Sequence, residues 1–84
     1  MKAYVITEIS EGDLCGTHIH TSLIGAISTI NAIFKEYHDD HQGEGDAKQE
    51  TVKSLTRIVV ADWELPGDEL GQSKLHFEVK KVKD

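Results

Sequence analysis

The segment Ser22–His38, SLIGAISTINAIFKEYH, decides the fold, because it is the longest stretch whose apolar residues recur with a helical period. At an increment of about 100° per residue, these apolar residues share one half of the helical wheel, and polar and small residues fill the other. We predict a helix capped by Thr21 or Ser22 and ending near His38. The side chains predicted to be buried are Leu23, Ile24, Ala26, Ile27, Ile30, Ile33, Phe34 and Tyr37.

The segments before this helix indicate a β-hairpin. Residues 2–9 (KAYVITEI) carry β-branched and aromatic residues at both parities, as a central strand does. A turn-forming stretch with two glycines follows, and residues 16–21 then alternate between apolar and polar side chains. Because successive side chains point to opposite faces of a strand, we expect Ile19 to face the helix and His18 and His20 to face away from it.

Two further strands are expected after the helix. Residues 39–51 contain no apolar residue larger than alanine, and we expect them to form a mobile acidic loop. Residues 55–65 return to strand composition, and residues 74–82 alternate between apolar and polar side chains. The sequence therefore predicts one α+β domain over residues 1–84, a two-layer sandwich in which a four-stranded antiparallel sheet (ββαββ) carries one helix on one face.

A single helix leaves the other face of the predicted sheet uncovered. Strands that are apolar on both faces would direct Tyr4, Ile6, Ile58 and Val60, or their neighbours of opposite parity, toward that face. An exposed apolar patch usually marks an association surface, so we expect a homodimer packed sheet to sheet, or a partner protein, at this place. In the alternative interpretation, sheet twist and residues 66–73 cover part of the face.

Composition indicates the cellular setting. The chain has a single cysteine, Cys15, which has no partner for an internal disulfide, and the residues after Met1 alternate instead of forming an apolar signal-peptide core. No apolar run approaches the roughly 20 residues that a membrane span needs. We expect a soluble cytoplasmic protein without a membrane partner.

Charge is distributed unevenly along the chain. The formal net charge is −6, and residues 36–69 hold ten Asp and Glu against three Lys and Arg. Such a field repels nucleic acid and steers the protein toward basic surfaces, including the nucleic-acid channels of other proteins. The alternative is an acidic loop that only maintains solubility. The candidate partner-binding residues are Glu36, Asp39, Asp40, Glu44, Asp46, Glu50, Asp62 and Glu64.

The histidines leave open an alternative function, a homo-oligomer that binds a metal or a small ligand. His18 and His20 share one strand face in the expected hairpin, and His76 would join them if its strand lies close. His38 and His41 follow the far end of the helix, too distant to add ligands to this group. Surface histidines are the simpler explanation, so we predict neither a metal site nor a cofactor.

The residue pattern contains no catalytic signature. Cys15 and His18 lack an orienting third group, and Asp62 and Glu64, which share one strand parity, are more typical of edge charges than of an acid–base pair. The two glycines of residues 43–45 lie in an acidic run that would repel phosphate. We therefore predict that the protein is not an enzyme.

Four features together define the format of the chain: the start MKAYVITEI, the ββαββ order, a solitary amphipathic helix and an acidic loop over residues 39–50. In this format the chain resembles the small acidic proteins with which phages inhibit bacterial defence systems, the anti-CRISPR type among them. The resemblance implies a non-enzymatic inhibitor that occupies a basic nucleic-acid-binding surface of its target in the host cytoplasm, often as a dimer.

Overall fold

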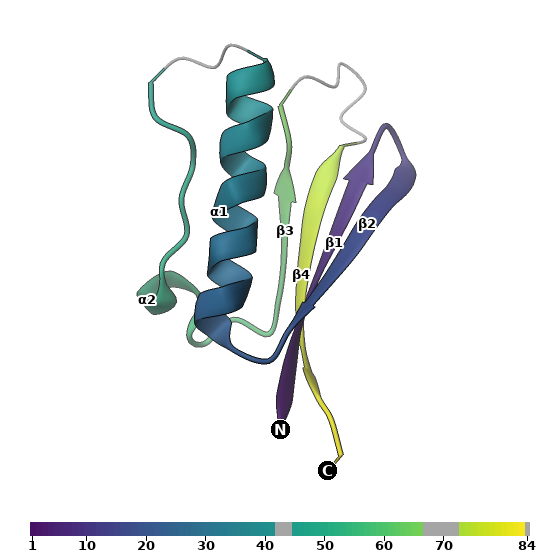
Figure 1. The fold of residues 1–84 in the computed structure, drawn as a ribbon, viewed down its shortest axis with the longest axis vertical. Helices are drawn as coiled ribbons and strands as arrows, with labels where there is room; N and C mark the ends of the chain where they lie inside the picture. Colours follow the sequence, from purple (N-terminus) through teal and green to yellow (C-terminus); the bar gives the residue numbers. More distant parts are fainter. Residues whose placement is uncertain (42–44, 67–72, 84) are drawn as a thin grey trace.

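A computed structural model describes residues 1–41, 45–66 and 73–83 (Figure 1). The described chain runs through two strands, a long helix, a single-turn helix and two more strands. Their bounds are Lys2–Ser10 (β1), Asp13–His20 (β2), Leu23–Asp40 (α1), Val52–Leu55 (α2), Val60–Glu64 (β3) and Lys74–Lys81 (β4). The predicted α+β class, with a four-stranded antiparallel sheet and one main helix packed on it, is confirmed.

The strands pair in the order β2-β1-β4-β3, and every neighbouring pair is antiparallel. β1 and β4 therefore form the centre of the sheet, and β2 and β3 form its edges. The central position of β1 agrees with its apolar residues at both parities. Ile6 lies opposite His18 of β2 and Phe77 of β4, and this register assigns the faces of all three strands because paired residues point to the same side.

The core lies between α1 and the covered face of the sheet. Five side chains of α1 are buried, spaced as an amphipathic helix requires, above the fully buried Ile6 and Phe77. Phe34 packs edge-on against Trp63 of β3, with ring centroids 5.5 Å apart. Each fully buried large side chain contributes roughly 1.5–3 kcal/mol to folding. The predicted burial of Ile24 is wrong, since this side chain lies at the margin of the apolar half of the helix and is 72% exposed.

The helix α1 begins where the sequence predicts and ends later. The Ser22 hydroxyl accepts a hydrogen bond from the Gly25 backbone N–H at 3.1 Å and so caps the first turn. At the other end the helix continues past His38 through Asp40. Asp39 and Asp40, which were expected to lie in a loop, are therefore held by helical backbone.

The predicted orientation of β2 is wrong. Ile19 points to the uncovered face and is 67% exposed, whereas His18 and His20 are on the side of α1. His20 Nε2 lies 2.8 Å from the Thr29 hydroxyl of the helix. The orientation follows from the register, because Ile19 pairs with Val5, which is on the uncovered face of β1. An edge strand is only partly covered by the helix, so the more apolar of its two sides does not have to face the core.

The strand predicted over residues 55–65 is wrong in its first part. The helix α2 ends at Leu55, which is buried, and its N-cap Thr51 exchanges hydrogen bonds with Ser54 in a capping box. β3 begins only at Val60 and is an edge strand of the sheet. The capping side chains decide the local structure here against the strand propensity of the β-branched residues around them.

The uncovered face of the sheet has an apolar half and a charged half. The sequence left open whether Tyr4 and Ile6 or their neighbours of opposite parity point to this face. On β1 the neighbours Ala3 and Val5 do, because Tyr4 and Ile6 are on the side of α1, and Ile58 precedes β3. Val60 does lie on the uncovered face and is 53% exposed. The apolar half, on β1 and β2, consists of Ala3, Val5, Ile9, Leu14 and Ile19. The charged half, on β3 and β4, consists of Asp62, Glu64, Lys74, His76, Glu78 and Lys80.

Candidate functional site

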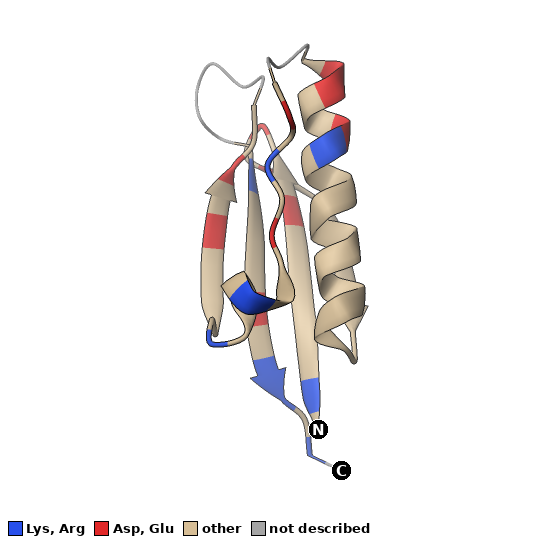
Figure 2. Ribbon diagram, turned by 90° about the vertical axis from the view of Figure 1, so that its left-hand side faces the viewer, with Lys and Arg blue, Asp and Glu red and all other residues tan. Residues whose placement is uncertain are grey.

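Opposite charges gather at opposite ends of the molecule. Acidic residues are frequent toward the end where α1 finishes, and Lys and Arg are frequent around the two chain termini and α2 (Figure 2). Both termini lie at this second end, because β1 starts and β4 finishes there (Figure 1). The molecule therefore presents a surface of each sign, and only the acidic one contains the predicted partner-binding residues.

The helix-end patch is the group of four exposed carboxylates, Glu36, Asp39, Asp40 and Asp46, on and just after the last turns of α1. Asp39 and Asp40 lie in the last turn itself, where the helix dipole places partial negative charge. Carboxylates at this end are unfavourable by about 0.3–1 kcal/mol each. One favourable contact is made, from His38 Nδ1 to Asp39 Oδ1 at 3.3 Å. Asp39 and Asp40 therefore interact unfavourably with the dipole of the helix that carries them.

A hollow of about 590 Å³ lies between α1 and the segment that returns beside it. Two carboxylates of the helix-end patch, Asp39 and Asp46, line it, and Lys35 is the one lysine or arginine among its described lining residues. His38 also lines the hollow, and its Nε2 is buried without a hydrogen-bond partner among the described residues. The two carboxylates suit a guanidinium or ammonium group, because such a group donates several hydrogen bonds at once.

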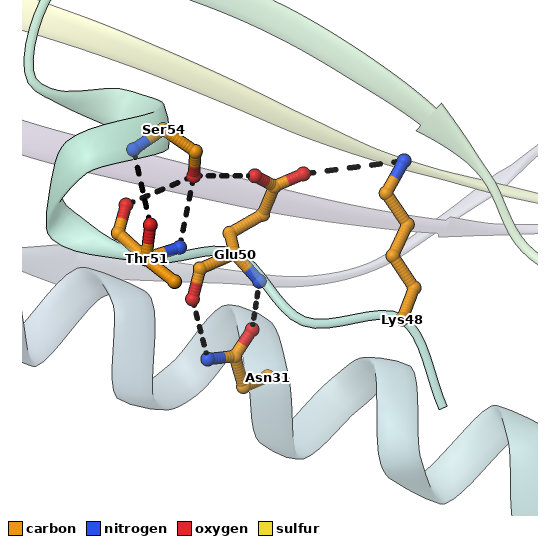
Figure 3. A network of polar contacts seen from close by, with 5 residues as sticks. All are labelled: Asn31, Lys48, Glu50, Thr51 and Ser54. Atoms are coloured by element: carbon orange, nitrogen blue, oxygen red, sulfur yellow. Dashed lines mark hydrogen bonds and ion pairs between the residues drawn. The ribbon is translucent and has the colours of Figure 1, made fainter. Parts of the chain in front are cut away.

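Glu50 is held by hydrogen bonds to Asn31 and Ser54 and does not belong to the helix-end patch. The Asn31 side chain forms two hydrogen bonds with the Glu50 backbone, of 2.9 and 2.8 Å (Figure 3). The Glu50 carboxylate accepts a hydrogen bond from Ser54 Oγ at 2.6 Å, has Lys48 Nζ at 3.9 Å, and its side chain is 13% exposed. The C-terminal end of the segment 39–51, which the sequence predicts to be an acidic loop, therefore contacts α1 and α2. Glu50 positions the segment, and its carboxylate is already occupied.

The remaining candidates do not join the helix-end patch. Asp62 and Glu64 point to the uncovered face of the sheet, away from α1. Asp62 Oδ1 lies 2.6 Å from His76 Nδ1, and Glu64 is paired with Lys74 across the strands. Glu44 lies outside the described residues. The seven predicted residues that the structure describes therefore belong to separate surfaces, which the linear sequence could not reveal.

No family model, no curated protein and no solved structure matches the chain. Within the described residues, no helix has the length and apolar character needed to cross a membrane.

The histidines do not form the group that the alternative function requires. His18 and His20 are on the helix side of the sheet, and His76 is on the uncovered side beside Asp62 and Glu78. Across residues 1–41, 45–66 and 73–83, no three His, Cys, Asp or Glu side chains are placed to hold a metal ion. The geometry therefore gives no support to a ligand set made of these three histidines.

A hydrogen bond that the sequence analysis missed joins the end of α1 to β1. The Tyr37 hydroxyl donates to Glu8 Oε1 at 3.0 Å. Burial, followed by this hydrogen bond and the charge of Glu8, raises the pKa of Tyr37 above its usual value near 10. A tyrosine at the margin of an apolar helical face gives no sequence signal for this contact, because its partner is 29 residues away.

Proposed function

We propose that this protein is a small non-enzymatic inhibitor that binds a basic surface of a nucleic-acid-binding protein through the helix-end patch. The observation that carries the proposal is the position of Asp39 and Asp40. They are exposed, they belong to the last turn of α1, and they oppose its dipole. A role in binding explains why Asp39 and Asp40 are present although they lower stability and do not pack in the core, because functional residues are commonly maintained at a cost in stability.

Charge complementarity would act mainly on the encounter between the two proteins. The four carboxylates of the patch meet lysines and arginines that otherwise hold phosphate groups, and complementary potentials both speed and orient association. The cations of this chain are concentrated at the opposite end, so its own field turns the patch toward a basic surface (Figure 2). The hollow beside Asp39 and Asp46 offers a place for one cationic side chain of the partner.

The resemblance of the chain to anti-CRISPR-type phage proteins, in element order, solitary helix and acidic loop, indicates which class of protein to propose as the target. Those inhibitors occupy nucleic-acid-binding surfaces of host defence proteins, and an acidic patch on a small rigid domain suits that role. We extend the proposal accordingly to a host defence protein that holds nucleic acid, encountered in the cytoplasm.

The proposed contact surface is narrower than the predicted set of residues. Its centre is the helix-end patch, and Glu44, which lies outside the described residues, remains a candidate from the sequence alone. Asp62 and Glu64 belong to the charged half of the uncovered face and form a second, separate candidate surface. Glu50 is assigned to the support of the segment that carries Asp46.

A homodimer remains part of the proposal, now through the apolar half of the uncovered face. Leu14 and Ile19 are 68% and 67% exposed there, beside Val5 and Ile9. The charged half next to them carries both signs, so two copies related by a two-fold axis would present Lys to Asp or Glu on each other. This face is opposite α1, so dimerisation through it leaves the helix-end patch free.

The test is inhibition of DNA cleavage by a panel of RNA-guided bacterial nucleases, with association rates measured on immobilised nuclease at several salt concentrations. Asp39→Asn, Asp40→Asn and Asp46→Asn together should slow association by about tenfold or more and flatten its salt dependence. The control is Glu11→Gln with Asp13→Asn, which removes from the β1–β2 hairpin the same charge that Asp39→Asn with Asp40→Asn removes from the patch. It should change the rate by less than about twofold.

Three outcomes would contradict the proposal. A patch variant that still inhibits like the unmodified protein would remove the patch from the mechanism. Equal slowing by Asp39→Asn with Asp40→Asn and by the control variant would assign the effect to net charge. Absence of binding and inhibition across the panel would exclude this class of target.

A further inference from the structure

A second candidate site, independent of the helix-end patch, lies at the basic end of the molecule. It is a cavity of about 350 Å³ between the start of α1, the outer ends of β1 and β4, and the segment that joins α2 to β3. This volume is within the range of small-molecule sites, about 300–1,000 Å³. The lining residues that matter here are Lys2, Tyr4, Leu23, Leu55, Arg57 and Val79.

The cavity combines an apolar interior with cations. Leu55 is buried, and Tyr4, Leu23 and Val79 are half-buried members of the core margin. Lys2 and Arg57 are exposed, and neither forms an ion pair in the described part of the chain. The Tyr4 hydroxyl likewise makes no hydrogen bond there. Three polar groups that have no partner among the described residues therefore line one mainly apolar cavity.

A neighbouring hollow extends the cationic side of this cavity. Its volume is about 420 Å³, and it is lined by Lys53, Ser54, Thr56 and Arg57. Thr56 and Arg57 line both spaces, so the two adjoin at these residues. Among the described residues, no Asp or Glu lines either space. An anionic group held by Arg57 would thus lie beside apolar walls on one side and a second cation, Lys53, on the other.

We propose that this cavity binds a small organic anion, a carboxylate or phosphate monoester that carries an apolar body. Apolar walls exclude a bare inorganic anion as the preferred ligand, and two unpaired cations exclude a cationic amphiphile. At roughly 30 Å³ for each water-sized unit, the cavity takes a body of about ten non-hydrogen atoms. The ligand is a free molecule, because the inner wall is formed by the buried Leu55 and the half-buried Leu23 and Val79, while Ile58 and Val59 at the mouth are exposed.

The test uses octanoate and octyl phosphate as probes, with acetate, inorganic phosphate and octylammonium as controls. Titration calorimetry should show one site for each of the two probes and no binding of the controls. Methyl resonances of Leu23, Leu55 and Val79 should shift on addition of octanoate. Lys2→Gln with Arg57→Gln should weaken octanoate binding by about tenfold or more, because both charge-assisted contacts are lost.

A matched variant separates the site from a general charge effect. Lys35→Gln with Lys74→Gln removes two cations from other surfaces and should leave octanoate affinity unchanged. All four positions are exposed, and circular dichroism checks that both variants fold. Equal affinity of the Lys2/Arg57 variant and the unmodified protein would overturn the proposal, and so would binding of octylammonium. Binding to phosphatidylglycerol vesicles without binding of monomeric octanoate would also overturn it.

Discussion

Neutralising Asp39 and Asp40 should change stability and association in opposite directions. In Asp39→Asn with Asp40→Asn, two carboxylates leave the negative end of the α1 dipole, each unfavourable by about 0.3–1 kcal/mol. The asparagine at position 39 keeps an oxygen that can accept the hydrogen bond from His38 Nδ1. We therefore expect the free energy of unfolding to rise by roughly 0.5–1.5 kcal/mol, while association with the basic partner slows.

Thermal unfolding followed by circular dichroism measures the first effect. For a domain of this size, about 1 kcal/mol shifts Tm by roughly 4–8 °C. The gain should shrink as salt is added, because the Debye length falls from about 30 Å at 0.01 M to about 8 Å at physiological ionic strength.

Relief of the overall negative charge would also stabilise the variant, so a control is needed. Glu11→Gln with Asp13→Asn removes two charges from the β1–β2 hairpin, outside any helix, and should raise Tm less. A helix-end variant that is less stable than the unmodified protein, or no more stable than this control, would refute the dipole argument. The functional proposal would then lose its main support.

Three further predictions concern single contacts. Asn31→Ala should remove both hydrogen bonds to the Glu50 backbone, lower the free energy of unfolding by about 1–3 kcal/mol and speed hydrogen exchange at the Glu50 amide. Unchanged exchange at this amide would contradict the anchoring role of Asn31. Ile19→Lys should lower the dimer fraction in light scattering without loss of helix signal, whereas a monomeric unmodified protein at high concentration would contradict the dimer. Tyr37→Phe should cost about 0.5–1.5 kcal/mol at neutral pH. The pKa of Tyr37 is raised in the folded state, so the neutral hydroxyl contributes fully to the free energy of unfolding below pH 10, and this contribution is lost as the pH rises further. Tyr37→Phe removes the titrating group, so this variant should lose less Tm above pH 10 than the unmodified protein does.

The elements predicted correctly are those that have a long periodic sequence pattern and bury only one of their faces. α1 has a helical apolar period over more than four turns, and β4 alternates Leu75 and Phe77 with polar residues, so both follow from periodicity. β2 was assigned the wrong orientation because an edge strand receives little burial, and its side is fixed by pairing with β1. α2 was missed because one helical turn has no period, and it depends on the reciprocal hydrogen bonds of Thr51 and Ser54.

Much less of the candidate site follows from the sequence. Exposure of the acidic residues is predictable, since unpaired carboxylates are almost never fully buried. Their grouping is not predictable, because Asp62 and Asp39 are on opposite sides of a sheet whose strand order no local pattern encodes. Glu50 appeared equivalent to its acidic neighbours, yet Asn31 holds its backbone and Ser54 holds its carboxylate. The cavity at Lys2 and Arg57 combines residues 55 positions apart in the chain.

The strand order also determines when this protein can fold during synthesis. The two central strands, β1 and β4, are the first and last of the described elements, and they pair from Lys2 with Lys81 to Ile9 with Lys74. Until the ribosome has released residues 74–81, the hairpin of β1 and β2 has an unpaired inner edge and the apolar face of α1 has half a sheet to cover it. The central strand pair of the sheet therefore cannot form in the nascent chain until β4 has emerged. Closure of the domain depends on contacts of the greatest sequence separation, which fold slowly.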